Sequence, residues 1–285
     1  MTTLPSVTRP PSATPVAEPP ARFRDLLASE WIKMRSLRST PWTLAFTALF
    51  VIGSSAVASL ADLNNLGRSR PDALQTPEFL CFDAYPAAGY MTLMLLAGSI
   101  GAVTIVSEYS SGLIRTTTVA VPARHPVVLA KAGVVAAVWT VVGAIISTGA
   151  FLVSQAILSE RHAGVPLTHP GVARAMVASA LVAPVCALVG LGLGVLIRHT
   201  AAAIVATLFT LLMLPTLFSQ SKQWSADVHH MMVVGAWKRL VQSWGEIPGG
   251  SPVRDATVSG SWCAYALWPL IAIALAVVVV RRRDV

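Results

Sequence analysis

The sequence predicts an all-α integral membrane protein with six transmembrane helices, on the strength of its composition, its apolar segments and its charge distribution. Apolar residues make up 54% of the 285 residues and charged residues only 12%, about half of the usual ~25%. A soluble fold of this size needs more charged side chains to cover its surface, so a soluble enzyme is strongly disfavoured. We therefore expect lipid to be the main solvent of the chain.

Six mostly apolar stretches contain no Asp, Glu, Lys or Arg. Because a helix rises 1.5 Å per residue, about 20 residues cross a hydrocarbon core of about 30 Å, and each stretch is near or above that length. The predicted spans are residues 42–61, 87–106, 132–158, 175–197, 200–218 and 261–280. Residues 1–21 are rich in proline and are predicted to form a disordered cytoplasmic tail. Residues 22–285 are predicted to form a single six-helix domain.

The basic residues indicate which side of the membrane each connection faces. If the N-terminus is cytoplasmic, the cytoplasmic segments hold 13 of the 21 Lys and Arg residues and five of the 13 Asp and Glu residues. The whole net charge of +8 then lies on that side, as the positive-inside rule expects. We therefore expect a multi-pass protein of the plasma membrane with both termini in the cytoplasm. This distribution explains the basic excess, so nucleic-acid binding is not expected.

Residues 22–40 are predicted to form an amphipathic elbow helix that lies on the membrane surface before the first span. On a helical projection, six apolar side chains fall on one arc of about 140°: Phe23, Leu26, Leu27, Trp31, Met34 and Leu37. Arg22 and Lys33 flank one edge and are expected to snorkel toward water, and Pro41 is expected to separate this helix from the first span. The segment is either a plain surface anchor or an elbow that also contacts a cytoplasmic partner.

Glu30 lies inside the apolar arc, where an unpaired carboxylate would be costly. We expect it to have a basic or hydrogen-bonding partner in residues 107–131 or in a neighbouring subunit. Residues 107–131 themselves form a long cytoplasmic connection. Gly112 permits a sharp turn there, and Pro122 and Pro126 are expected to separate the connection from the third span.

The predicted outer loop, residues 219–260, contains a second amphipathic pattern. Trp237, Leu240, Val241 and Trp244 recur at helical spacing, and Gly235 is expected to separate them from the apolar run before them. This helix either re-enters the membrane or rests on its surface. Small residues give the second and fourth spans faces for close helix contact, either within one chain or between two copies: Gly98, Gly101, Gly190, Gly192 and Gly194.

Other kinds of chemistry have little support in the sequence. The spans contain no acidic or histidine relay, which counts against an ion-coupled carrier, and their Ser, Thr and Gln side chains are expected to hydrogen-bond between helices. Three scattered cysteines do not form a disulfide framework. His229 and His230 are interpreted as surface residues because no further ligands complete a metal site. We expect no catalytic residues, no metal and no cofactor on this chain.

Three segments in a fixed order resemble a known family. Residues 108–115 read E-Y-x-x-G-x-I-R and are followed by P-x-R at 122–124 and by A-K at 130–131; an elbow precedes them, and R-R-R-D follows the last span. In this the chain resembles the permease subunits of ATP-binding-cassette transporters of the type-2 (ABC-2) class.

The resemblance implies a transporter of two permeases, identical or homologous, and two ATPase subunits, usually working as an exporter. A coupling helix at about residues 112–119 would fit a cleft on the ATPase, and ATP and magnesium would bind there, because this chain lacks the pattern G-x-x-x-x-G-K-[ST]. The implied partner-binding residues of the coupling loop and elbow are Glu108, Gly112, Leu113, Ile114, Arg115, Pro122, Arg124, Lys131 and Glu30. A non-transport membrane protein, such as a sensor partner or assembly factor, is the alternative.

Overall fold

The computed structural model describes residues 22–36, 39–66, 83–112, 124–160, 162–218, 222–242 and 256–282. This part of the chain is helical and contains no β-strand. Six helical segments are long and apolar enough to cross a membrane: Ser39–Asn64, Ala87–Ser110, His125–Ser159, Val172–Ile197, Thr200–Leu217 and Val258–Arg282. The predicted all-α class and the six spans are therefore confirmed, with most helices extending a few residues beyond the predicted limits.

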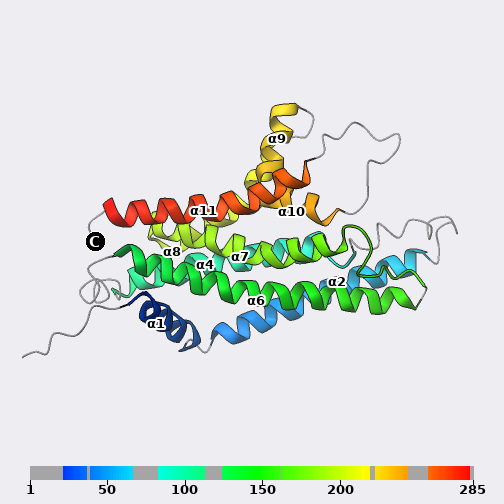
Figure 1. Ribbon diagram of the computed structural model, residues 1–285, viewed down its shortest axis with the longest axis horizontal. Helices are drawn as coiled ribbons and strands as arrows, with labels where there is room; N and C mark the ends of the chain where they lie inside the picture. The colour runs from blue at the N-terminus through cyan, green and yellow to red at the C-terminus, as the bar shows by residue number, and fades with distance from the viewer. Residues whose placement is uncertain are drawn as a thin grey trace, which may run out of the picture.

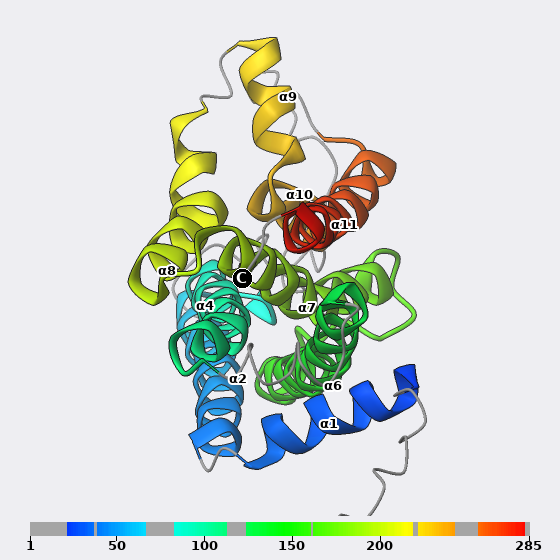
Figure 2. The same ribbon diagram turned by 90° about the vertical axis from the view of Figure 1, so that its left-hand side faces the viewer.

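The helices form an elongated bundle with one short helix lying across it. In chain order they are α1 (Phe23–Ser36), α2 (Ser39–Leu66), α4 (Ala87–Ser110), α6 (Arg124–Ser159), α7 (Val172–Ile197), α8 (Thr200–Leu208), α9 (Gln223–Met231), α10 (Val233–Val241) and α11 (Val258–Arg282). Figure 1 shows the long helices running along one axis. In the end-on view of Figure 2, α7 is central, and α1 crosses beneath α2 and α6.

The two ends of this bundle are built from different elements. One end, which we call the α1 end, is where α1 meets the last turn of α4 and the first turns of α6. Helix α7 also ends there. We call the α10 end the opposite one, where α10 packs against α7 and α11 near the start of α4. By the charge distribution of the sequence, the α1 end is the one expected to face the cytoplasm.

The core of the bundle depends on close contact between α4 and α7. A Cβ atom added to Gly190 would lie 1.9 Å from the carbonyl oxygen of Gly98, and one added to Gly101 would lie 2.0 Å from that of Ala187. Only glycine permits the two backbones to come so near. The small-residue faces of these spans are therefore used for packing within one chain.

Serine hydroxyls join neighbouring spans, as the sequence predicts. Ser59 of α2 donates to Ser154 of α6 at 2.8 Å, and Ser147 of α6 donates to the Met176 carbonyl of α7 at 2.7 Å. All three serine side chains are fully buried. Hydrogen bonds between helices satisfy polar groups that lipid cannot.

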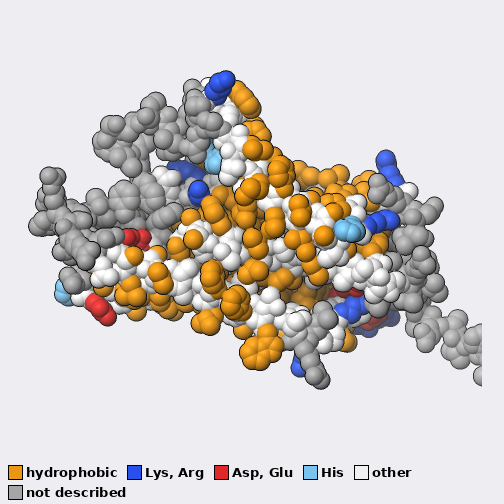
Figure 3. All heavy atoms as spheres, turned by 180° about the vertical axis from the view of Figure 1, so that it is seen from behind, with side chains coloured by type: hydrophobic (Ala, Val, Ile, Leu, Met, Phe, Trp, Pro, Cys, Tyr) orange, Lys and Arg blue, Asp and Glu red, His pale blue; other side chains and the backbone are white. Residues whose placement is uncertain are grey.

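The outer surface is largely apolar. Figure 3 shows hydrophobic side chains spread along the length of the bundle on the face in view. The α7 span is 67% buried, whereas the α2 and α11 spans are each only 22% buried. Large side chains such as Trp42 and Leu49 on α2 are more than 70% exposed. Exposed apolar area of this extent indicates a lipid-facing surface.

Two prolines that were expected between helices lie in the first turn of a helix. Pro41 lies in the first turn of α2, which begins at Ser39, and Pro126 lies in the first turn of α6, which begins at Arg124. The first backbone N–H groups of a helix have no partner within it, so a proline there removes no hydrogen bond. Lys131 accordingly lies two turns inside α6, about 10 Å from the first residue of the helix.

The fifth span exists but is irregular. After α8, the chain forms a π-helical turn at Phe209–Met213 and a 3₁₀ turn at Leu214–Leu217. Pro215 is the physical reason, because it has no N–H to donate and its ring crowds the carbonyl four residues earlier. The link to α7 is as short as predicted and consists of Arg198 and His199.

The second amphipathic pattern forms α10, which is buried in the protein. Trp237, Leu240 and Val241 share one helical face and are inaccessible; Trp244 lies outside the described residues. The predicted break at Gly235 is wrong, because Gly235 lies inside α10. A Cβ atom at Gly235 would lie 2.2 Å from the His229 carbonyl oxygen. Gly235 therefore permits the close approach of α9 and α10.

Aromatic rings and one arginine hold α10 in place. The Trp237 ring stacks on Tyr90 of α4 with centroids 5.2 Å apart, and its indole N–H donates to Ser179 of α7. Arg174 of α7 donates to the carbonyls of Leu240 and Gln242. Both carbonyls lie at the C-terminus of α10, where carbonyl oxygens receive no hydrogen bond from within the helix. A positive charge there also interacts favourably with the helix dipole.

Candidate functional site

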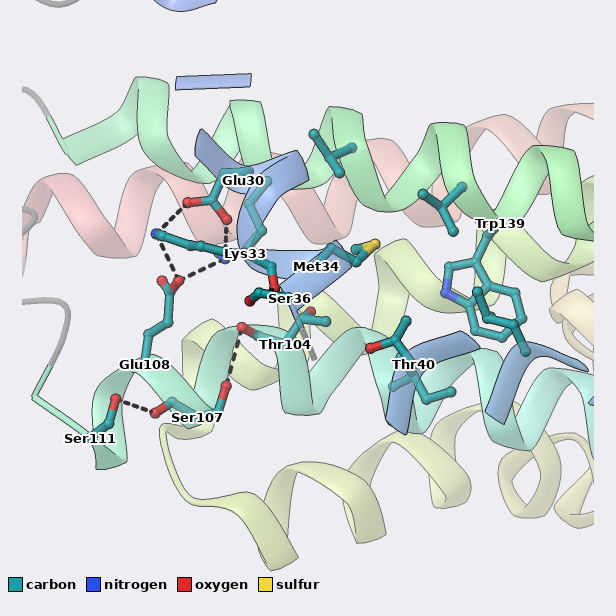
Figure 4. A pocket seen from close by; sticks show the side chains of 15 residues that line it. Glu30, Lys33, Met34, Ser36, Thr40, Thr104, Ser107, Glu108, Ser111 and Trp139 are labelled. Atoms are coloured by element: carbon teal, nitrogen blue, oxygen red, sulfur yellow. Dashed lines mark hydrogen bonds and ion pairs between the residues drawn. The ribbon is translucent and has the colours of Figure 1, made fainter. Parts of the chain in front are cut away.

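Four charged side chains from three helices meet at the α1 end and form what we call the charge cluster: Glu30 and Lys33 of α1, Glu108 of α4 and Lys131 of α6. The Lys33 ammonium lies 2.7 Å from Glu30 and 3.0 Å from Glu108. The Lys131 ammonium lies 3.0 Å from Glu108 and also contacts Glu30. Each carboxylate therefore contacts both ammonium groups (Figure 4).

Each member is positioned by a regular helix. Glu30 and Lys33 lie three residues apart and therefore project from the same side of α1. Glu108 belongs to the last turns of α4, and Lys131 lies two turns inside α6. Because α1 crosses beneath the bundle (Figure 2), Lys33 can contact Glu108 of α4 while Glu30 contacts Lys131 of α6.

The cluster supplies the partner that the sequence requires for Glu30. A basic partner from residues 107–131 was expected, and Lys131 is that partner, so this prediction is confirmed. The prediction that Lys33 snorkels toward water is wrong, because its ammonium is held by two carboxylates. The ion pair between Lys33 and Glu30 could have been predicted from their i, i+3 spacing on the helix.

Burial makes the cluster an interdependent unit. The side chains of Glu30, Lys131 and Glu108 are 4%, 6% and 10% exposed, whereas that of Lys33 is 34% exposed. Moving a charge out of water is costly unless an opposite charge and hydrogen bonds compensate it. Two positive and two negative groups in alternation compensate one another, and removal of any one leaves a buried charge without its full set of partners.

The Lys33 ammonium is stabilised in its charged form. Burial by itself lowers the pKa of this group, but the hydrogen bonds to Glu30 and Glu108 and the negative charge of both outweigh burial, so that the pKa is raised above 10.5. A raised pKa means that Lys33 stays protonated throughout the neutral range. Its contribution to stability is present below the unfolded-state pKa and is lost only as the pH rises through the folded-state value.

The elbow helix turns its apolar arc toward the bundle, with Glu30 near the middle of the buried face. Leu26 and Glu30 are buried against the bundle, while Phe23 and Trp31 are about half exposed and Ile32 is 65% exposed. The face toward the protein is therefore centred near the charged pair. The outward aromatic side chains remain available to the surrounding medium, and a membrane interface is the medium that suits them.

A pocket of about 350 Å³ lies beside the charge cluster, between α1, α2, α4 and α6. The four charged side chains line one end, and the nearly inaccessible Trp139 ring of α6 lines the other (Figure 4). Ser36 and Thr104 lie between these ends, and aliphatic side chains complete the wall. The pocket is thus amphipathic along its length.

The remaining residues that the resemblance implies fall at the edge of the described chain. Gly112 has a φ of +72°, a left-handed backbone conformation that favours glycine, and nothing lies within 4 Å of where its Cβ would be. The turn predicted at this residue is therefore confirmed. Leu113, Ile114, Arg115 and Pro122 lie outside the described residues. Arg124 is the first residue of α6, and its side chain also lies outside the described part of the chain.

One arginine at the α1 end makes a contact that no sequence pattern predicts. Arg198, which ends α7 in a left-handed conformation, lies with its guanidinium 4.9 Å from the centre of the Tyr109 ring. A guanidinium over an aromatic face is attracted by the negative face of the ring. The contact joins the end of α7 to the end of α4, next to Glu108.

The described residues contain no group of three or more His, Cys, Asp or Glu side chains that could hold a metal ion. His229 instead hydrogen-bonds to the carbonyl of Pro215 through its Nδ1. Comparison with models of known protein families and with curated proteins found no match for this chain.

Proposed function

We propose that this chain is the membrane-spanning permease subunit of an ATP-binding-cassette transporter of the type-2 class, working as an exporter and driven by a separate ATPase subunit. The six spans, the crossing helix α1 and the order of the sequence motifs support this proposal. The observation that carries it is the charge cluster, because it ties α1 to the two helices that flank residues 113–123.

The cluster has the geometry of a mechanical link. Residues 113–123 connect α4 to α6, and Glu108 and Lys131 lie on either side of that connection. A force applied to the connection by an ATPase would act on both helices, and through Glu30 and Lys33 on α1 as well. In this proposal Arg115 contacts the ATPase, whereas Glu108 and Lys131 transmit the movement inside the chain.

The energy source would lie on the partner. Without the G-x-x-x-x-G-K-[ST] pattern this chain has no P-loop of its own, so ATP and magnesium would bind to the ATPase. A second permease, identical or homologous, would complete the pathway for the cargo across the lipid bilayer.

Association with the ATPase is tested by purification in mild detergent. We expect an ATP-hydrolysing subunit to co-purify with the wild-type chain, and Arg115→Ala to weaken its binding about ten- to a hundredfold, the loss expected for a hydrogen bond to a charged group. Lys238→Ala, an exposed basic residue on α10 at the opposite end, is the matched control and should bind normally. If no ATPase co-purifies, the chain is better explained as a sensor partner or assembly factor.

Transmission through the cluster is tested separately from binding. Lys33→Met removes the most exposed member of the cluster, so the protein should still fold and still bind the ATPase. The ATP hydrolysis rate of the reconstituted complex should fall toward the rate of the ATPase alone. A variant complex that hydrolyses ATP at the wild-type rate would show that the cluster is structural only.

A further inference from the structure

The pocket beside the charge cluster has the dimensions and the chemistry of a binding site. Sites for small molecules have volumes of roughly 300–1,000 Å³, are mostly apolar and contain a few polar groups that orient the ligand. This pocket measures about 350 Å³, and its charged side chains lie at the end opposite the Trp139 ring. A ligand that fits must therefore be amphipathic.

The charged end favours a zwitterionic group. The cluster has two positive and two negative side chains, so it attracts neither an anion nor a cation by net charge. An ammonium group has three N–H donors, and Lys33 uses one on Glu30 and one on Glu108. One carboxylate oxygen of Glu108 accepts from both lysines, so its other oxygen takes no part in these two contacts, and Glu108 lines the pocket. A phosphate beside Lys33 and an ammonium beside Glu108 would satisfy both.

The apolar end has the length of an acyl-chain segment. Lys131 and Trp139 are eight residues apart on α6, which corresponds to about 12 Å along the helix. Along this distance the pocket wall includes Val134 and Val138 of the same helix. A lipid whose head group lies at the cluster would therefore bring the middle of one chain to the Trp139 ring.

The position of the pocket indicates the bilayer as the source of the ligand. The helices that border it carry exposed aromatic side chains, among them Trp31 on α1 and Trp42 and Phe46 on α2. These side chains suit the boundary between head groups and acyl chains. A lipid of the adjacent leaflet thus needs no transfer through water to reach the pocket.

We propose that this pocket binds one zwitterionic phospholipid, with its phosphate at Lys33, its ammonium at Glu108 and one acyl chain against Trp139. The bound lipid fills the space under α1 and completes the polar contacts of the charge cluster. This proposal does not depend on the transport function proposed above, since a membrane protein without an ATPase could hold the same lipid.

Quenching of tryptophan fluorescence by brominated lipids tests the proposal. The full chain in detergent is titrated with phosphatidylethanolamine brominated in the middle of its acyl chains, and Trp139 is isolated as the difference between the wild type and Trp139→Phe. We expect Trp139 to be half-quenched at a lipid fraction at least about tenfold lower than with equally brominated phosphatidylglycerol or diacylglycerol. Trp42, which is 79% exposed, should be quenched by all three lipids alike.

Two variants show whether the quenching comes from the pocket. Val138→Phe fills the pocket without altering a charge and should abolish the quenching of Trp139, while Val141→Phe, on the exposed side of α6, should leave it unchanged. Glu108→Gln should remove the preference for phosphatidylethanolamine over phosphatidylglycerol. The proposal is overturned if Trp139 is not quenched, if all three lipids quench it equally, or if Val138→Phe has no effect.

Discussion

The two ends of the bundle are held together by different forces. At the α1 end, four buried charges join α1, α4 and α6. At the α10 end, Trp237 stacks on Tyr90, and Arg174 binds the last carbonyls of α10. Removing one partner from a buried ion pair costs more than the intact pair contributes, whereas aromatic packing tolerates small changes and fails when space is lost or a cavity is made.

The two ends also differ in free space. A pocket of about 350 Å³ adjoins the charge cluster, while at the α10 end Gly235 is pressed against the His229 carbonyl. Helices can shift only where neighbouring atoms leave room. The pocket gives the α1 end room to rearrange, whereas α9 and α10 are closely packed at Gly235.

The largest effect is expected from Lys131→Met at the α1 end. The substitution leaves Glu30 and Glu108 buried with a single lysine between them, so we expect a loss of about 3–5 kcal/mol in the free energy of unfolding. Thermal unfolding in detergent, followed by size-exclusion chromatography, measures it. Lys33→Met in the same cluster is the matched control and should cost clearly less, because Lys33 is 34% exposed and Lys131 only 6%. Equal losses would show that burial does not govern the cluster.

A smaller effect is expected from Gly235→Ala at the α10 end. The new methyl group would lie 2.2 Å from the His229 carbonyl oxygen, a backbone atom that cannot move by itself. We expect a loss of about 1–3 kcal/mol from overpacking. Gly53→Ala is the control, because nothing lies within 4 Å of its added Cβ and alanine favours the helix. If both variants unfold at the same temperature, close packing of α9 on α10 does not limit stability.

The smallest effect is a difference in pH response between the ends. Asp83, just before α4 at the α10 end, is half-buried beside Asp62, and burial, the hydrogen bond to Asp62 and the negative charge of Asp62 raise the pKa of Asp83 to about 8. The folded protein then binds a proton that the unfolded chain has released above about pH 4. Stability is therefore fully present below that pH and is lost as the pH rises toward 8.

The measurement is the unfolding temperature between pH 5 and pH 9. We expect it to decrease over this range in the wild type, and Asp83→Asn to remove most of the decrease. Lys33 stays charged over the whole range, so it should contribute no slope of its own. An undiminished slope in Asp83→Asn would assign the pH response to another group.

Much of the fold follows from local pattern. Apolar segments without charges predict all six spans, and the carboxylate of Glu30 inside an apolar arc predicts a buried basic partner. Local pattern fails where tertiary context changes the meaning of a residue. Pro41 and Pro126 are typical of helix breaks but lie in first turns, where a missing N–H has no consequence. Lys33 has the pattern of a surface residue until α1 is placed across the bundle.

By itself, the sequence determined that the chain is a bundle of six long apolar helices, because uncharged segments of this length are stable only in lipid with every backbone hydrogen bond made inside the helix. Tertiary structure alone decided which charges meet, that α10 is buried, and that an amphipathic pocket lies under α1. Glu30 and Lys131 are 101 residues apart, and Lys33 and Glu108 are 75 apart. Contacts over such separations depend on how whole helices pack, which no local periodicity encodes.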